Sequence, residues 1–147
     1  MQSNKFILII GNPGLGKTSL GRALVAYFVQ KQGYQFIYTR DVKSANRVYR
    51  PDKEQIFFFD DFWGSCLKET DYCFDDERRL AEFIKKIHNS NNKLLVLTSR
   101  DYVLKQGLIN NLELEDIFNI NQYTLELKKY SLKLRLDIQC VIYTNQL

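Results

Sequence analysis

The segment Gly11-Asn12-Pro13-Gly14-Leu15-Gly16-Lys17-Thr18 constrains the fold of this chain more than any other. It fits the pattern G-x-x-x-x-G-K-[ST], which is typical of loops that bind phosphate groups. The apolar run at residues 6–10 comes just before it, as expected of a strand that is buried on both faces. Residues 18–32 predict a helix that ends at Gly33. Strand, glycine-rich loop and helix thus follow one another in the order that phosphate binding requires.

The residue types in this loop suit a nucleotide. Glycines admit backbone angles that other residues avoid, and they leave space for a ligand close to the backbone. The amides of the loop and of the first helical turn would bind phosphate at the positive end of the helix dipole. Lys17 would reach the outer phosphates, and the Thr18 hydroxyl would ligate Mg²⁺. The predicted cofactor-binding residues are Gly11, Asn12, Pro13, Gly14, Leu15, Gly16, Lys17, Thr18 and Ser19.

Composition limits the class of protein. The 147 residues suit a single domain, and 45% hydrophobic and 14% aromatic residues predict a folded chain. No apolar stretch approaches the roughly 20 residues of a membrane span, so no membrane partner is expected. The polar N-terminus leads directly into the first strand, which speaks against a secretory signal. Three cysteines without zinc-type spacing favour free thiols, and with them a cytoplasmic location.

The net charge of +4 is unevenly distributed, and part of the N-terminal excess lies beside the glycine-rich loop. Residues 1–50 contain eight Lys or Arg residues against one acid, Asp41. A site for a polyanion is a sufficient reason for this excess. We do not expect a nucleic-acid surface, because no stretch interleaves basic and aromatic residues.

The rest of the chain predicts alternating strands and helices. Further strands are expected at residues 34–39, 55–59, 93–98 and 120–127, and further helices at 41–49, 78–89 and 101–107, with a polar loop over 64–77. The apolar pattern of residues 129–146 fits a strand or a helix, and its Leu, Lys and Arg content favours the helix. This alternation predicts an α/β fold with a parallel sheet and helices on both faces.

Polar side chains stand where the predicted strands end, at the edge where such sheets bind ligands. Asp60 follows an apolar run and would hold Mg²⁺ together with Thr18, which makes these two the predicted metal residues. Asp61 would orient or deprotonate an attacking water. Arg100, after the strand at 93–98, would approach the γ-phosphate of a nucleotide. The predicted catalytic residues are therefore Asp61, Lys17 and Arg100.

With these residues in view, the chain resembles the STAND class of signal-transducing P-loop ATPases. GNPGLGKT matches their Walker A motif, QIFFFDDFWG (residues 55–64) resembles their Walker B motif, and KLLVLTSRDYVL (residues 93–104) resembles the strand that ends in T-[TS]-R. The sequence is most similar to the third group of novel STAND NTPases, which occur in bacterial defence proteins. The resemblance covers residues 6–143.

The resemblance implies a three-layer P-loop NTPase core with a mainly parallel five-stranded sheet in the order 5-1-4-3-2. Residues 129–147 would then begin a truncated helical lid, and residues 1–147 would be a single domain excised from a larger protein. The implied function is Mg²⁺-dependent ATP binding and slow hydrolysis to ADP. It would act as a signalling switch in an antiviral defence protein that self-associates on activation.

Three other functions remain open from the residues alone. A mechanical ATPase of the AAA+ kind would need an arginine supplied across subunits, for which Arg78 and Arg79 are candidates. A P-loop kinase for a small molecule would need an Arg-rich lid, and no segment stands out as one. A nucleotide-binding module without turnover needs only the glycine-rich loop.

Overall fold

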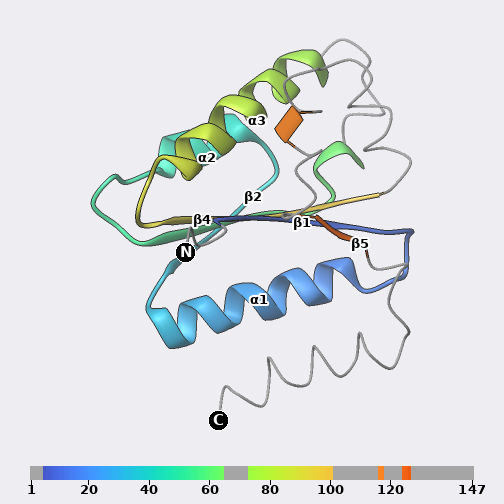
Figure 1. Cartoon of the computed structure of the whole chain (residues 1–147), viewed down its shortest axis with the longest axis horizontal. Helices are drawn as coiled ribbons and strands as arrows, with labels where there is room; N and C mark the ends of the chain where they lie inside the picture. Colours follow the sequence, from blue (N-terminus) through green and yellow to red (C-terminus); the bar gives the residue numbers. More distant parts are fainter. Residues whose placement is uncertain (1–4, 65–72, 101–115, 118–123, 127–147) are drawn as a thin grey trace.

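The computed structural model describes residues 5–64, 73–100, 116–117 and 124–126. A parallel β-sheet lies between two layers of helices (Figure 1). Helix α1 (Lys17–Gln32) covers one face of the sheet, and helices α2 (Val42–Val48) and α3 (Cys73–His88) cover the other. This is the three-layer α/β arrangement that the alternating pattern predicts.

The sheet has four strands of five to seven residues and one short strand at its edge. The strands are β1 (Phe6–Ile10), β2 (Gln35–Thr39), β3 (Gln55–Phe59), β4 (Lys93–Ser99) and β5 (Thr124–Glu126). Their order is β2-β3-β4-β1-β5, and every neighbouring pair is parallel. Strand β4 therefore lies between the strand that precedes the glycine-rich loop and the strand that precedes the paired acids.

The α/β class and the parallel order 1-4-3-2 of the main strands are confirmed. The predicted five-stranded sheet is confirmed only in part, because four of its strands are long and the fifth is short. For the fifth, predicted over residues 120–127, the described strand is three residues long and pairs only with the second half of β1. Its position at the edge explains the weak signal, since an edge strand lacks the long apolar run of a strand that is buried on both faces.

Alternate side chains of the strands supply the two halves of the core. In β3, Phe57 and Phe59 pack against the α2–α3 layer, whereas Ile56 and Phe58 pack against the α1 layer. All four are fully buried, which accounts for the unbroken apolar sequence of this strand. The sheet thus gains its stability from burial on both faces.

The helices begin and end close to the predicted residues, with one exception. Helix α1 ends at Gly33, whose left-handed φ of 73° suits glycine, and Asp41 caps α2 by accepting a hydrogen bond from the Ser44 amide at 2.8 Å. Helix α3 begins at Cys73, five residues before the predicted start at residue 78, so the predicted loop over 64–77 is too long. Asp75 and Asp76 suggested a loop, yet acids in a first turn stabilise a helix through its dipole.

Several expectations fall outside the described residues. These are the helix predicted at 101–107, the helix or lid at 129–147 and two of the three cysteines; the side chain of the third, Cys73, is not described either. Within the described parts of the chain, no helix combines the length and the apolar character that crossing a membrane demands.

A one-turn helix, η1 (Phe62–Gly64), anchors the chain directly after the paired acids. Its Trp63 ring is buried against Phe62, and the Trp63 Nε1 donates a hydrogen bond to Glu77 Oε1 at 3.1 Å. Glu77 lies in the first turns of α3 and is 3% exposed. Burial raises the pKa of the Glu77 carboxyl above its ordinary value, and the hydrogen bond from Trp63 offsets only part of this rise.

Helix α1 approaches the sheet most closely at Gly21. A Cβ added at this position would lie 2.7 Å from Cε2 of Phe58 and 3.5 Å from Cγ2 of Thr98. Phe58 is fully buried, so its ring can shift only if its neighbours in the core shift too. The absence of a side chain at Gly21 therefore sets the distance between α1 and strands β3 and β4.

We expect Gly21→Ala to lower the free energy of unfolding by about 1 kcal/mol. Overpacking of a core costs about 1–3 kcal/mol, and the better helix propensity of alanine returns about 1 kcal/mol. Urea unfolding of the single variant, of Phe58→Leu and of the double variant measures the coupling between the two positions. With the ring replaced by leucine, Gly21→Ala should become neutral or stabilising; an equal loss in both backgrounds would contradict the close approach.

Glu77 predicts a specific pH dependence of stability. Its folded pKa is raised, so the folded state holds the proton more tightly and stability falls as the pH rises above the ordinary Glu value of about 4.3. Glu77→Gln keeps an acceptor for Trp63 and should raise the free energy of unfolding at pH 7 while flattening this decline. The control is Glu82→Gln on the same helix, where the side chain is 63% exposed and the slope should not change.

Candidate functional site

The glycine-rich loop joins the end of β1 to the start of α1. Gly14 and Gly16 have left-handed φ angles of 81° and 85°, which residues with a side chain rarely adopt. Gly16 is the N-cap of α1 and offers no capping side chain, and the first turn of the helix contains no acid. The positive end of the helix dipole is thus left for an external anion. Asn12, Pro13, Gly14 and Ser19 are exposed along this loop, so a ligand can reach it.

Lys17 folds back over the loop that precedes it. Its Nζ donates a hydrogen bond to the carbonyl oxygen of Asn12 at 3.0 Å, and the residue is only 9% exposed. The ammonium group is therefore held against the loop that precedes α1. This adds positive charge to an anion site that the helix dipole already favours.

The structure brings together Thr18 and Asp60, which are 42 residues apart in the sequence. The Thr18 Oγ1 donates to Asp60 Oδ1 at 2.8 Å and lies 3.1 Å from Oδ2. A hydroxyl and a carboxylate are oxygen ligands of the kind that Mg²⁺ takes beside nucleotide phosphates. The donor set at this point therefore fits Mg²⁺, and Thr18 and Asp60 are the residues that would hold it.

Asp61 turns away from Asp60 and faces Arg100. It is the only described residue other than glycine with a positive φ, 51°. Its Oδ2 accepts a hydrogen bond from Nη2 of Arg100 at 2.7 Å, with both side chains about one-third exposed (36% and 35%). The other carboxylate oxygen, Oδ1, is enclosed and accepts no hydrogen bond in the described structure. Asp61 therefore has one engaged oxygen and one with its acceptor capacity unused.

Gly64 makes room for this arrangement. Its amide donates to the carbonyl oxygen of Asp61 at 2.8 Å, which closes the turn. A Cβ at position 64 would overlap the Asp61 carboxylate. The glycine of the DDFWG segment is thus explained by the side chain of the second acid, a role that the sequence alone does not reveal.

Thr98 is a second residue that sequence reasoning missed. Its Oγ1 donates to Asp60 Oδ1 at 2.7 Å and accepts the backbone N–H of Asp61 at 2.8 Å. A signal for it exists, since Thr98 ends the apolar run of β4 one residue before Ser99 and two before Arg100. Its importance becomes visible only once β4 is seen to lie between β1 and β3.

The predicted site residues thus gather at one edge of the sheet, in two groups. Thr18 contacts Asp60, Asp61 contacts Arg100, and the glycine-rich loop is joined to β4 by a hydrogen bond from the Gly11 amide to the Ser99 carbonyl oxygen at 3.3 Å. Arg100 lies beside an acid, whereas the sequence predicted that it faces a phosphate.

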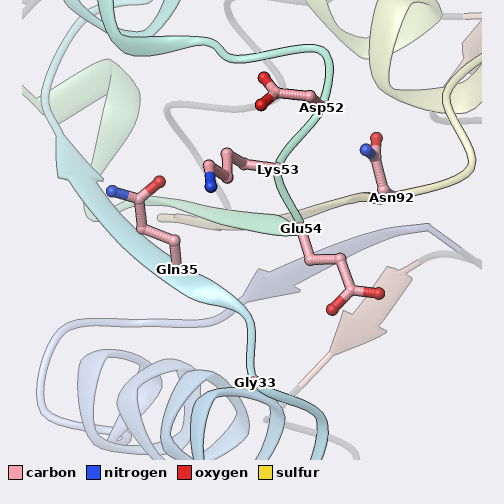
Figure 2. Close-up of a pocket in the computed structure, with 6 residues that line it drawn as sticks. All are labelled: Gly33, Gln35, Asp52, Lys53, Glu54 and Asn92. Atoms are coloured by element: carbon pink, nitrogen blue, oxygen red, sulfur yellow. The ribbon is translucent and has the colours of Figure 1, made fainter.

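An open cavity of about 710 Å³ lies at the opposite end of the strands, where they begin (Figure 2). It is lined by Gly33 and by polar residues at or just before the beginnings of β2, β3 and β4, namely Gln35, Asp52, Lys53, Glu54 and Asn92. Open parallel sheets bind their ligands beyond the carboxyl ends of the strands. This cavity lies beyond the amino ends, so we assign the candidate nucleotide site to the edge with the glycine-rich loop.

Comparison with known proteins agrees with this assignment. None of the curated proteins compared with the chain matches it. One family model, Novel STAND NTPase 3, matches residues 1–141, which include every site residue described above. The resemblance to the third group of novel STAND NTPases is therefore confirmed, and it indicates a nucleotide-binding signalling module with NTPase activity in general. This match covers most of the chain, and Thr18 of the Walker A motif contacts Asp60 of the Walker B motif. The chain therefore belongs to the Novel STAND NTPase 3 family.

Proposed function

We propose that this domain binds ATP with Mg²⁺, hydrolyses it slowly to ADP and acts as a signalling switch within a larger STAND protein. The observation that carries the proposal is the contact between Thr18 and Asp60 at 2.8 Å. A hydroxyl from the first turn of α1 and a carboxylate that directly follows β3 meet there. This is the pair that a nucleotide with its metal ion requires.

The chain's own groups divide the work of binding. The amides from Gly14 to Thr18 and the dipole of α1 bind the phosphates, and Lys17 neutralises their outer charge. Thr18 and Asp60 hold Mg²⁺, which spreads the negative charge that develops on the phosphate oxygens. Asp61 orients an attacking water.

The ion pair between Asp61 and Arg100 supports a switch in preference to a fast enzyme. While Arg100 binds Asp61, the acid is held away from the role of a base, which fits slow hydrolysis. The γ-phosphate of ATP is a second anion that Arg100 can bind, and ADP lacks this phosphate. The arginine can thus report which nucleotide is bound.

The mechanical ATPase is less well supported. It would need Arg78 or Arg79 to reach across subunits. In the described structure, Arg78 pairs with Glu82, and Arg79 pairs with Asp75 and Asp76, all on α3. The proposed switch also includes self-association on activation, a parent protein in antiviral defence and a cytoplasmic location.

The proposed function is tested by two substitutions at the site. Lys17→Ala should abolish ATP binding in calorimetry, because the outer phosphates lose their counter-charge. Asp61→Asn should leave ATP affinity within a few-fold while slowing phosphate release by on the order of a hundredfold. The controls are Lys31→Ala at the far end of α1 and Asp52→Asn at the opposite edge of the sheet, which should change neither property. Unchanged affinity in Lys17→Ala would refute the site.

The switch itself is tested at Arg100. Arg100→Ala should narrow the preference for ATP over ADP, because the removed group is the one that distinguishes the γ-phosphate. Calorimetric titrations with both nucleotides measure the ratio of the two affinities. Arg22→Ala, an exposed arginine on α1, is the control. If the ratio for Arg100→Ala equals that of the wild type, Arg100 serves only to pair with Asp61.

A further inference from the structure

The hydroxyl of Thr98 joins the two acids of the site. Thr98 is fully buried, and its partners lie 38 and 37 residues earlier in the chain. It donates its single proton to Asp60 Oδ1 and accepts the backbone N–H of Asp61. Its donor and one acceptor site are both used, so the orientation of the hydroxyl is fixed.

The two acids need such a fixed point because they diverge. Asp60 directly follows β3 and faces Thr18, whereas Asp61 adopts a left-handed φ of 51° and faces Arg100. A left-handed backbone is unfavourable for aspartate unless its surroundings hold it. The Thr98 oxygen holds the amide that begins this turn, and the Gly64 amide holds the carbonyl oxygen that closes it.

The Asp60 carboxylate depends on Thr98 in a second way. Oδ1 receives hydrogen bonds from both Thr18 and Thr98, at 2.8 and 2.7 Å. Mg²⁺ bound to the Thr18 oxygen would use a lone pair of that oxygen and leave its proton for Asp60. The bond from Thr98, on the central strand β4, orients the same carboxylate oxygen from the sheet.

We propose that Thr98 is a positioning residue of the nucleotide site. It directs Asp60 toward the Mg²⁺ position and Asp61 into its left-handed turn, without itself contacting the nucleotide. The inference rests on the proposed function, because it assigns Thr98 a part in Mg²⁺-dependent binding. Hydrogen-bond partners of a metal-holding carboxylate typically contribute about 10–100-fold to metal affinity.

The test measures ATP affinity by calorimetry with Mg²⁺ and with EDTA, using the 147-residue chain. Thr98→Val keeps the shape of the side chain and removes the hydroxyl. In this variant, Mg²⁺ should increase ATP affinity by a factor about tenfold or more smaller than in the wild type. The ATP affinity in EDTA should stay unchanged. Thr98→Ser keeps the hydroxyl and should restore the gain.

The matched control is Thr39→Val. Thr39 ends strand β2, which pairs with β3, is buried and donates its hydroxyl to the carbonyl oxygen of Asp41 at 2.9 Å. This variant loses a buried hydroxyl at the same edge of the sheet, but one remote from the acids in the hydrogen-bond network. It should lower thermal stability and leave the Mg²⁺-dependent gain at the wild-type value.

The outcomes separate the two proposals. If the wild type gains affinity from Mg²⁺ and Thr98→Val gains as much, the role of Thr98 is refuted and the proposed function stands. An equal loss in Thr98→Val and Thr39→Val would likewise reduce Thr98 to a packing residue. A wild type that binds no ATP would overturn the proposed function and this inference with it. If Thr98→Val does not fold, Thr98→Ala removes the same hydroxyl without adding a methyl and carries the same expectation.

Discussion

The close approach of α1 to the sheet is the constraint on which the candidate site depends. Gly21 brings the helix down onto Phe58 and Thr98, four residues after Lys17 begins it. Thr18 and Gly21 lie three residues apart, so they share a helix face and one cannot move toward the sheet without the other. The 2.8 Å contact between Thr18 and Asp60 is therefore built on packing one turn further along the helix. In this fold, core packing sets the geometry of the polar site.

The sequence predicted those features that are dictated by local residues. The glycine-rich loop, the apolar runs of β1, β3 and β4, and the acids at a strand end each carry their own signal. The predicted start of α3 is wrong because Asp75 and Asp76 are compatible with both a loop and a helical first turn. The left-handed turn at Asp61 was not predictable either, because it depends on Thr98 in another strand and on the space above Gly64. Such features arise from contacts between distant segments, and no local pattern encodes them.

The position of β4 explains why the polar groups form one network. Parallel pairing on both sides aligns its end with the ends of β1 and β3, so Thr98 and Ser99 reach the acids and the loop respectively. A hydroxyl suits this central place because it can donate to one neighbour and accept from another. An apolar residue would continue the run of β4 equally well but would leave the Asp61 amide without its partner, at a cost of about 1–3 kcal/mol.

The ion pair between Asp61 and Arg100 limits how the proposed switch can work. Pairs with about one-third of each side chain exposed contribute at most about 1 kcal/mol, which is roughly a fivefold bias between two states. Moving a protein from 1:99 to 99:1 needs about 5.5 kcal/mol of differential binding. Exchange of Arg100 between Asp61 and a phosphate can therefore bias the equilibrium between the two states of the switch. By itself it cannot shift the protein fully from one state to the other. The remaining energy must come from the other phosphate and Mg²⁺ contacts of the site, provided that they too differ between the two states.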